Sequence, residues 1–429
     1  MRVAIHTFKI QALLLFAFSL FLGGCATNTF RAVDVSSADF LNRTQQQKID
    51  GIIVSAAAPD AQETEQLTGL NLYDQGVQPI WLRIENTTAN RIRLNLWSID
   101  RDYFSPIEVA YTNRKKFTNS SYSALESWFN DNGMSRHIPP GESRSGLVFT
   151  HLTPGTKGFN LDIIGDQKAS TFTFFLPMPG FTPDYMHIDF KNLYPTEQIK
   201  NFSSTQLMTE MEQNFPCCTE SQSGEKNGAP INVILVGTPT AVRRSLLRGN
   251  WLETSIDNEM LEQAEQQHYD GRPVDGTFYQ DREDGNERIQ LNIWMTSLRV
   301  DSTPVWAAQA FYRNREYSIL NNREVMQLTQ NTPLLHHFVN DSISADMDSA
   351  KAFTLQNFWY NNCLEKLAIV GGVEAKSIDN PGTTFDGLGY VTDGTRAVLF
   401  LSEQAQAYDD VEIISTGLLG LSTRGVSHD

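Results

Sequence analysis

The densest group of side chains that could ligate a metal or perform catalysis is His336 and His337, followed by Asp341, Asp346 and Asp348. A metal site needs several His, Asp or Glu side chains that converge on one point. Adjacent residues of an extended segment point to opposite faces, so at most one of the two histidines would join a site. Asp346 and Asp348 open a predicted helix, where acidic side chains complement the helix dipole. We therefore expect helix-start chemistry and no metal here; if a catalytic site exists, its candidates are His337 and Asp341.

Other motifs that could carry chemistry are incomplete. Gly237-Thr238 follows a buried strand and opens a helix, a place where backbone N–H groups hold anions, but it lacks the glycine and lysine pattern of phosphate-binding loops. Ser223-Gly224-Glu225-Lys226 matches S-x-x-K by letter, without the S-D-N and K-T-G motifs that accompany it in penicillin-binding enzymes. The sequence also has no H-E-x-x-H and no G-x-S-x-G. It therefore contains no complete catalytic motif and predicts no cofactor.

Aromatic residues suggest a second kind of site. Trp81, Trp97, Tyr103, Phe104 and Trp128 could line a face on which sugars stack. Such residues more often fill the core of a β-domain, which is what we expect here.

The N-terminus resembles the signal peptide of bacterial lipoproteins. Arg2 and Lys9 are the only Lys, Arg, Asp or Glu residues before Cys25, and residues 10–24 form an apolar run that is too short to span a membrane. The run ends in Leu22-Gly23-Gly24-Cys25, which is similar to the lipobox in which the cysteine receives a diacylglyceryl group before cleavage on its N-terminal side. The expectation is that residues 1–24 are removed and that Cys25 carries the lipid. An ordinary secretory signal with a chance cysteine is the alternative.

Residue 26 and the charge of the chain indicate where the protein acts. An Asp after the lipidated cysteine would resemble an inner-membrane retention signal, and Ala26 instead favours the outer membrane, facing the periplasm. The 429 residues include 34 Lys and Arg against 50 Asp and Glu, a net charge of −16 that argues against nucleic acid as a partner. In an oxidising compartment two of Cys217, Cys218 and Cys363 could pair. Either the adjacent cysteines join each other, or one of them joins Cys363, or no disulfide forms.

Residues 51–190 contain short, alternating, β-prone runs and predict an immunoglobulin-like β-sandwich. Residues 85–91 are a plausible hairpin connection between two of its strands, and residues 122–130 predict one helix. The predicted organisation is a signal peptide (1–24), a tether (25–50), the sandwich (51–190), a linker (191–229), an α/β or α+β domain (230–402) and a tail (403–429).

The second domain begins with Ile231-Asn232-Val233-Ile234-Leu235-Val236-Gly237, a continuous apolar strand of the kind that is buried on both faces. Thr238 and Pro239 supply the N-cap and the first-turn proline of a helix that ends at Gly249. Further strands are predicted at 288–298, 303–313, 367–375 and 396–402, and helices near 258–267 and from 344 to 360; the last helix places Ile343, Met347, Ala350, Thr354 and Phe358 on one stripe.

The order of several motifs in this domain resembles the LssY C-terminal domain family. The similarity covers about residues 229–402 and consists of Pro230–Thr238, Trp251, Gly271-Arg272-Pro273-Val274, Ile293-Trp294, Pro304-Val305-Trp306 and His337. The family's stretch H-x-[IV]-x-P-x-[IV]-D-x-E-R-D corresponds here to His337–Asp348, with Asp341, Ser344, Asp346 and Met347 in place of Pro, Asp, Glu and Arg. Family members often lie beside, or are fused to, membrane segments that resemble phosphatidic acid phosphatases; the resemblance implies the fold but no activity. The first domain, with Gly76–Trp81 and Asp102–Pro106, resembles a companion domain of lipoproteins of this type.

These observations predict a lipid-anchored cell-envelope protein that acts as a non-enzymatic binding or accessory module. The alternative is an envelope hydrolase that acts on a phosphorylated lipid or glycan with its site near His337. A third hypothesis is a structural partner of a membrane transporter or secretion system. The expected partners are the membrane, through the anchor, and an envelope protein, lipid or glycan.

Overall fold

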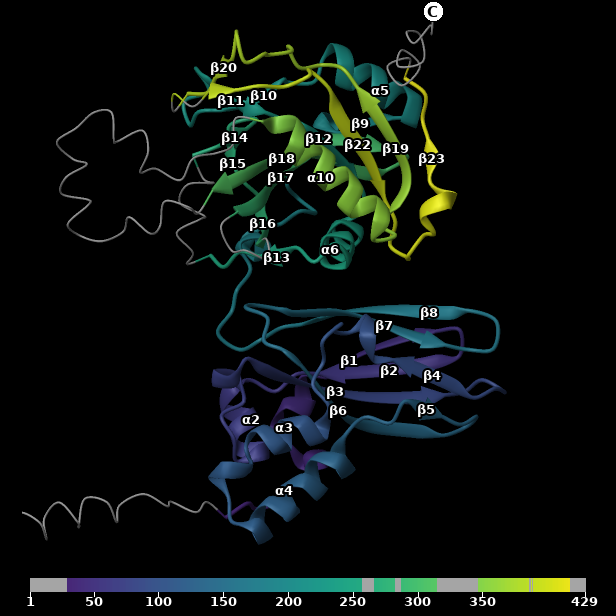
Figure 1. The fold of residues 1–429 in the computed structure, drawn as a ribbon. Helices are drawn as coiled ribbons and strands as arrows, with labels where there is room; N and C mark the ends of the chain where they lie inside the picture. Colours follow the sequence, from purple (N-terminus) through teal and green to yellow (C-terminus); the bar gives the residue numbers. More distant parts are fainter. Residues whose placement is uncertain are drawn as a thin grey trace, which may run out of the picture. The chain divides into compact units, whose positions relative to one another are not determined.

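A computed structural model describes residues 29–256, 266–281, 287–314, 346–385, 387 and 389–416. The chain forms two compact units, which are Met1–Leu152 with Asp162–Ser170, and Thr153–Leu161 with Thr171–Asp429. The fold is mixed and β-rich, as the sequence indicates (Figure 1).

One four-stranded sheet, of order β1-β2-β3-β6, lies in the first unit. A second four-stranded sheet has the order β5-β4-β7-β8, and the boundary between the units passes through its strands β7 and β8. The elements of this part of the chain are η1 (Val35–Ser37), η2 (Asp39–Arg43), β1 (Gln45–Ile49), β2 (Ile52–Ala57), α2 (Ala61–Thr68), η3 (Tyr73–Gln75), β3 (Val77–Asn86), β4 (Ile92–Asn95), η4 (Leu96–Ser98), α3 (Pro106–Thr112), η5 (Arg114–Lys116), α4 (Asn119–Asn132), β5 (His137–Ile138), β6 (Ser143–His151), β7 (Lys157–Ile164) and β8 (Ala169–Leu176).

Strand β3 is buried on one face, and on its other face Arg83 is exposed. Ile80, Leu82 and Ile84 alternate along it and have no exposed surface. Trp81, on the opposite face, packs against a core to which α2, α3 and α4 contribute residues such as Leu67, Val109 and Phe129. The helix that the sequence predicts at 122–130 is therefore part of α4, and it covers this sheet together with two helices that the sequence did not indicate.

The predicted hairpin at residues 85–91 is wrong, because β3 and β4 lie in different sheets. Strand β3 pairs with β2 and β6, whereas β4 pairs with β5 and β7. The buried Asn86 side chain donates to the carbonyl oxygens of Asn90 (2.8 Å) and Ile138 (3.1 Å), so the connection is held as a crossing between sheets. Alternation alone predicts a strand but not its partner.

The predicted tether (25–50) is also wrong from residue 29 onward. Phe30, Val35 and Phe40 belong to the core under the helices, and β1 completes the first sheet. The segment is polar on average, but these three apolar residues are spaced so that all of them are buried, and composition did not reveal this.

The second unit is built on a nine-stranded sheet of order β13-β16-β17-β18-β12-β22-β19-β23, to which β9 adds alongside β17. A small sheet has the order β11-β10-β14-β15, and β20 pairs with β21. The elements are η6 (Asp184–His187), η7 (Thr196–Gln198), β9 (Lys200–Phe202), α5 (Ser204–Gln213), β10 (Cys218–Glu220), β11 (Asn227–Pro230), β12 (Val233–Val236), α6 (Pro239–Arg248), β13 (Leu252–Glu253), β14 (His268–Tyr269), β15 (Arg272–Pro273), β16 (Gly276–Asp281), β17 (Glu287–Val300), β18 (Thr303–Asn314), α10 (Met347–Tyr360), β19 (Leu364–Val370), β20 (Gly382–Thr383), β21 (Gly389–Tyr390), β22 (Arg396–Leu401), η9 (Tyr408–Asp410) and β23 (Glu412–Ile413).

The apolar strand predicted at the start of this unit is confirmed as β12, and all four of its residues are buried. It pairs antiparallel with β18 and parallel with β22, which places it in the middle of the sheet. The Thr238 hydroxyl accepts the N–H of Ala241 at the start of α6, and Gly249 ends that helix, as expected. Helices α6 and α10 pack on one face of the sheet and α5 on the other.

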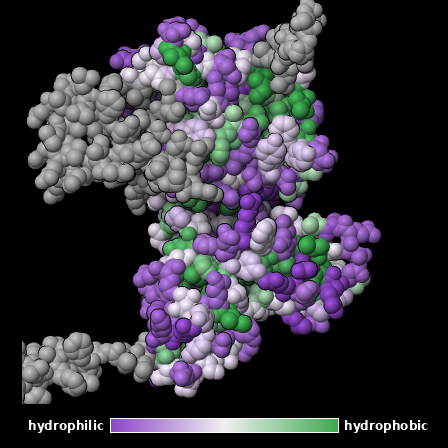
Figure 2. All heavy atoms as spheres, viewed as in Figure 1, coloured by the Kyte–Doolittle hydropathy of each residue, from purple (hydrophilic) through white to green (hydrophobic). Residues whose placement is uncertain are grey.

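The predicted linker (191–229) and part of the predicted tail (403–429) belong to the second unit. Leu207, Met208 and Met211 of α5 are core residues, and β9 and β10 pair with other strands. Strand β23 pairs with β19, and its Glu412 forms an ion pair with Lys366 at 2.7 Å. Residues 417–429 and the helix predicted near 258–267 lie outside the described residues, the latter except for its last two positions. Hydrophilic residues predominate on the face of the described chain seen in Figure 2, with apolar residues in small groups.

Candidate functional site

The residues that the sequence singles out are only partly described. His337 and Asp341, the candidate catalytic pair, and Cys25, the candidate lipid attachment site, lie outside the described residues. Asp346 and Asp348, from the same acidic stretch, lie at the start of α10.

Asp346 is the N-cap of α10. One of its carboxylate oxygens accepts the backbone N–H groups of Asp348 and Ser349, both at 3.0 Å, and the other accepts the Ser349 hydroxyl at 2.6 Å. The Ser349 hydroxyl, together with these N–H groups, lowers the pKa of Asp346. The interpretation of this stretch as helix-start chemistry is confirmed for Asp346.

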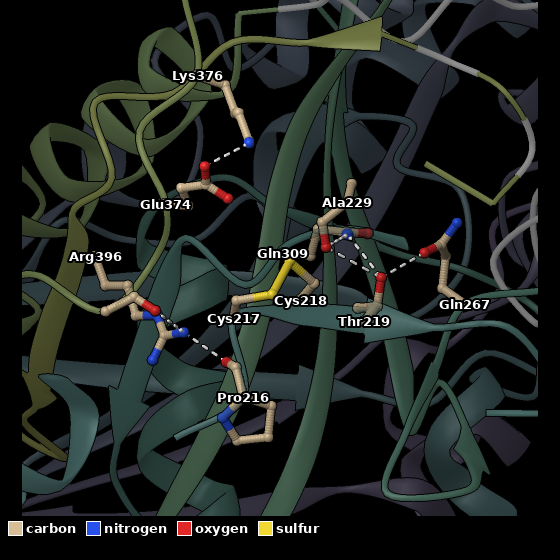
Figure 3. The surroundings of a disulfide bond; sticks show 11 residues. Pro216, Cys217, Cys218, Thr219, Ala229, Gln267, Gln309, Glu374, Lys376 and Arg396 are labelled. Atoms are coloured by element: carbon tan, nitrogen blue, oxygen red, sulfur yellow. Dashed lines mark hydrogen bonds and ion pairs between the residues drawn. A yellow bond between two sulfur atoms is a disulfide. The ribbon is translucent and has the colours of Figure 1, made fainter. Parts of the chain in front are cut away.

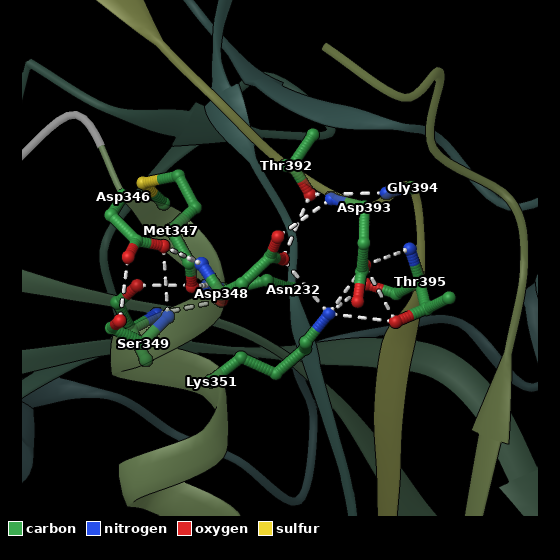
Figure 4. Close-up of polar contacts among 11 residues, drawn as sticks. Asn232, Asp346, Met347, Asp348, Ser349, Lys351, Thr392, Asp393, Gly394 and Thr395 are labelled. Atoms are coloured by element: carbon green, nitrogen blue, oxygen red, sulfur yellow. Dashed lines mark hydrogen bonds and ion pairs between the residues drawn. The ribbon is translucent and has the colours of Figure 1, made fainter. Parts of the chain in front are cut away.

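Asp348 belongs to a cluster around the buried ammonium group of Lys351 (Figure 4). Lys351 Nζ donates to Asp348 Oδ1 at 2.9 Å, to Asp393 Oδ1 at 2.6 Å and to Thr395 Oγ1 at 2.7 Å. Asp348 Oδ2 in turn accepts the backbone N–H of Asp393 at 2.7 Å. An ammonium group has three protons, and three close oxygens occupy them, so Lys351 connects α10 to the loop before β22 and is not available as a base.

The charges in this cluster stabilise one another. Burial alone would raise the pKa of Asp393, but hydrogen bonds from Lys351 and Thr395 outweigh it and lower that pKa. The Asp393 carboxylate is thereby kept ionised beside Lys351. Among the residues that the structure describes, no group of three or more His, Cys, Asp or Glu side chains could hold a metal ion.

The cysteines follow the first of the three predicted alternatives. Cys217 and Cys218 form a disulfide with each other (Figure 3). Cys363 is free and buried. Burial raises the pKa of the Cys363 thiol to about 12, so it stays protonated and unreactive. Next to the disulfide, the buried guanidinium of Arg396 donates to the carbonyl oxygen of Pro216 at 2.5 Å, and burial lowers its pKa to about 10.

A buried polar network begins immediately after the disulfide (Figure 3). The Thr219 hydroxyl donates to Gln267 Oε1 at 2.6 Å. Gln309 Nε2 donates to Thr219 Oγ1 at 3.3 Å and to the Ala229 carbonyl at 3.1 Å. All of these residues are buried, so the network links the small sheet to the large one without access to bulk water.

The network continues across the large sheet. Gln309 of β18 lies opposite Asn292 of β17, which lies opposite Thr277 of β16. Asn292 Oδ1 accepts Gln290 Nε2 at 2.9 Å and the Thr277 hydroxyl at 3.3 Å. We call Thr277, Gln290, Asn292, Trp294 and Gln309 the polar face of the sheet.

Several atoms of the polar face have no partner among the described residues. They are Gln290 Oε1, Asn292 Nδ2 and Trp294 Nε1, and all three side chains have no exposed surface. Residues i, i+2 and i+4 of a strand point to the same side, so these atoms form a line along β17. One hydrogen-bond acceptor (Gln290 Oε1) and two donors (Asn292 Nδ2 and Trp294 Nε1) thus lie together, buried from bulk water.

Two acidic residues lie at the edge of the same sheet. Asp184 Oδ2 accepts the backbone N–H of Thr277 at 2.7 Å, and Glu253 Oε1 accepts the Tyr185 hydroxyl at 2.5 Å and Arg243 Nε at 2.8 Å. Burial, with a smaller contribution from the charge of Glu253, raises the pKa of Asp184 to about 8. The second carboxyl oxygen of each residue is buried and has no partner among the described residues. The protonated carboxyl group of Asp184 therefore lies near Glu253, which has one carboxyl oxygen without a partner among the described residues.

Sequence reasoning missed both features. In residues 289–293 the polar Gln290 and Asn292 alternate with isoleucine and leucine, a pattern typical of a strand with one face in water. Both faces are buried, and nothing in the local pattern shows it. Asp184 is adjacent to Pro183 and resembles an ordinary turn residue in the sequence.

Three of the five aromatic residues lie in or against the core, as expected. Trp128 is a core residue, and Trp81 and Phe104 pack against the same core. Tyr103 receives a hydrogen bond from Arg136 at 2.6 Å. Trp97 is 66% exposed and does not join the core.

Two comparisons with known proteins found no match. A scan against models of protein families gives no match, and neither does a search of curated proteins. In the part of the chain that the structure describes, no helix has the length and apolar character to span a membrane.

Proposed function

We propose that this protein is a lipid-anchored envelope protein whose second unit binds a neutral polar ligand at the polar face of the large sheet. The lipobox-like sequence ending at Cys25 supports the anchor and the periplasmic location. The disulfide between Cys217 and Cys218 supports an oxidising compartment. The observation that carries the binding function is the line of unpartnered polar atoms on β17.

A buried polar atom without a partner costs about 1–3 kcal/mol, so a line of three on one strand supports a bound ligand that satisfies them. The groups are amides and an indole N–H, all uncharged, and they therefore favour a ligand rich in hydroxyl or amide groups over an ion. A saccharide of the cell envelope has this chemistry.

The test is calorimetric titration of the chain from Ala26 to Asp429 with the neutral disaccharide of N-acetylglucosamine. The described fold begins at Thr29, so this chain keeps every described contact. Binding that heats of dilution do not explain is the expected result. Absence of binding to this disaccharide and to longer glycan fragments would contradict the proposal.

Two tryptophans provide matched variants. Trp294 and Trp306 are both buried, but Trp306 Nε1 donates to the Gly237 carbonyl at 2.9 Å, whereas Trp294 Nε1 has no described partner. Both substitutions leave a cavity in the core and lower the unfolding free energy. Trp294→Phe should in addition weaken ligand binding about tenfold. Trp306→Phe also loses a buried hydrogen bond, so it should cost about 1 kcal/mol more unfolding free energy than Trp294→Phe and leave ligand binding unchanged.

The hydrolase alternative is favoured by a different observation, the protonated Asp184 near Glu253. A buried carboxyl group whose pKa is raised toward neutrality can act as a general acid. This alternative would move the site from His337 to the sheet edge. It predicts release of reducing sugar from the same glycan fragments, abolished by Asp184→Asn but not by His337→Ala.

The identities of the two domains remain part of the proposal. We infer that the sheets β1-β2-β3-β6 and β5-β4-β7-β8 form a β-sandwich, which the burial of Ile80, Leu82 and Ile84 on one face of β3 supports. We also infer that the second unit is an LssY-type domain, which the order of motifs from Pro230 to His337 supports.

A further inference from the structure

The chain enters the first unit at Phe30. Its backbone N–H donates to the Ser121 hydroxyl at 2.6 Å, and its ring lies edge-on to Trp128 and Phe117 at centroid distances of 6.0 and 6.4 Å. Five residue steps separate Phe30 from Cys25, a span of at most about 18 Å. A lipid on Cys25 would therefore hold this end of the unit close to the membrane surface.

The surface beside Phe30 is basic. Arg114, Lys115 and Lys116 form η5, are exposed, and directly precede Phe117, which contacts the Phe30 ring. Three cations therefore directly precede the residue that contacts Phe30, where the chain enters the first unit.

Helix α3 adds exposed apolar groups to these cations. Ile107 and Tyr111 are one helical turn apart and are 52% and 53% exposed. The Arg114 guanidinium lies 4.1 Å from the centre of the Tyr111 ring, so the basic and aromatic groups are adjacent. We call Ile107, Tyr111 and Arg114–Lys116 the α3–η5 surface.

The charge of this surface is opposite to that of the whole chain. Residues 105–118 contain three basic residues and one acidic residue, Glu108, whereas the chain has a net charge of −16. Glu108 is engaged in the capping box of α3, where its carboxylate accepts the Ser105 N–H at 3.2 Å. The three cations therefore face solvent, and none of them forms an ion pair within the described residues.

We propose that the α3–η5 surface docks on an anionic phospholipid bilayer beside the anchor. Clustered Lys and Arg side chains bind anionic headgroups, and an aromatic ring with an aliphatic neighbour is favoured at the membrane interface. A lipid anchor within about 18 Å raises the local concentration of headgroups, so a contact too weak to recruit the free protein becomes populated. The protein then has a fixed orientation on the membrane.

This inference rests on the proposed anchor at Cys25, so its test supplies the anchor chemically. A chain from Cys25 to Asp429 is coupled through the Cys25 thiol to a maleimide lipid; Cys217 and Cys218 are paired and Cys363 is buried, so coupling is selective. The vesicles are phosphatidylethanolamine with phosphatidylglycerol (3:1) or phosphatidylcholine alone. Amide hydrogen exchange of residues 105–118 is measured on both.

The expected result is exchange at least about fivefold slower on the anionic vesicles, with protection lost in 0.5 M salt. Replacing the three basic residues of η5 by glutamine (Arg114→Gln, Lys115→Gln, Lys116→Gln) should abolish the protection. Equal exchange on the two kinds of vesicle, or unchanged protection in the triple variant, would overturn the proposal.

A matched variant controls for the loss of three positive charges. Lys48, Arg91 and Arg93 are exposed on or beside β1 and β4 of the same unit, and their replacement by glutamine should leave the protection intact. Whether cells acylate Cys25 is determined separately, by mass spectrometry of the protein purified from membranes. Failure of the anchor and failure of the docking surface are thus distinguished.

Discussion

Asp184 accepts a hydrogen bond from the backbone N–H of Thr277 at 2.7 Å through one carboxyl oxygen, while its other oxygen is buried without a partner among the described residues. One N–H group does not compensate for the removal of this carboxyl group from water, so its pKa rises to about 8. Asp184 is therefore mostly protonated at neutral pH.

The first prediction is a pH dependence of stability. The folded state holds the Asp184 proton up to about pH 8, whereas the unfolded chain releases it near pH 4. The unfolded state thus binds fewer protons between these values, and the unfolding free energy falls as pH rises through this window, by up to about 1.4 kcal/mol per pH unit. Urea unfolding at pH 5, 7 and 9 measures the slope.

Asp184→Asn keeps an oxygen for the Thr277 N–H and should flatten this slope. Asp189→Asn is the matched control, because Asp189 is exposed and its pKa is lowered by Asn192, so it titrates below the window. A slope that survives in Asp184→Asn would show that other groups, such as the buried Asp275, dominate it.

A second prediction concerns the Lys351 cluster. Lys351→Met should lower the unfolding free energy by about 2 kcal/mol, because it leaves the carboxylates of Asp348 and Asp393 without their cation; both are partly exposed, which limits the loss. The double variant Lys351→Met with Asp393→Asn should lose less than the sum of the two single variants. Additive losses in thermal or urea unfolding would mean that the ion pair is unimportant.

The third prediction is the state of the thiols. In the chain from Ala26 to Asp429, iodoacetamide should label no cysteine in the native protein, one after denaturation and three after denaturation and reduction. The singly labelled residue should be Cys363. Labelling of Cys217 or Cys218 without reduction, read by peptide mass spectrometry, would contradict the disulfide and weaken the assignment to an oxidising compartment.

Local signals predicted the central elements of the second unit well. Strand β12 and helix α6 were evident because an apolar run, an N-cap threonine, a first-turn proline and a terminal glycine act over a few neighbouring residues. The stripe of α10 was predicted from spacing, and its described members Met347, Ala350, Thr354 and Phe358 are all buried.

Predictions that depended on average composition were wrong. Residues 29–50 and 191–229 are polar on average, yet Phe30, Phe40 and Met211 are core residues. A few well-placed apolar side chains are enough to fix a segment, and their partners are distant in the sequence. The predicted pairing of β3 with β4 was wrong for the same reason, because the partners of β3 are β2 and β6.

The sequence alone determined the features that depend on neighbouring residues: the lipobox-like end at Cys25, strand β12 with helices α6 and α10, and the helix start at Asp346. Tertiary structure alone decided which cysteines pair, that Lys351 is surrounded by oxygens, and that Gln290, Asn292 and Trp294 are buried without partners. Burial and electrostatics are set by residues far apart in the chain, and the pKa of Asp184 cannot be inferred from its neighbours in the sequence. The candidate site is therefore a property of the assembled sheet, whereas the proposed anchor is a property of four consecutive residues.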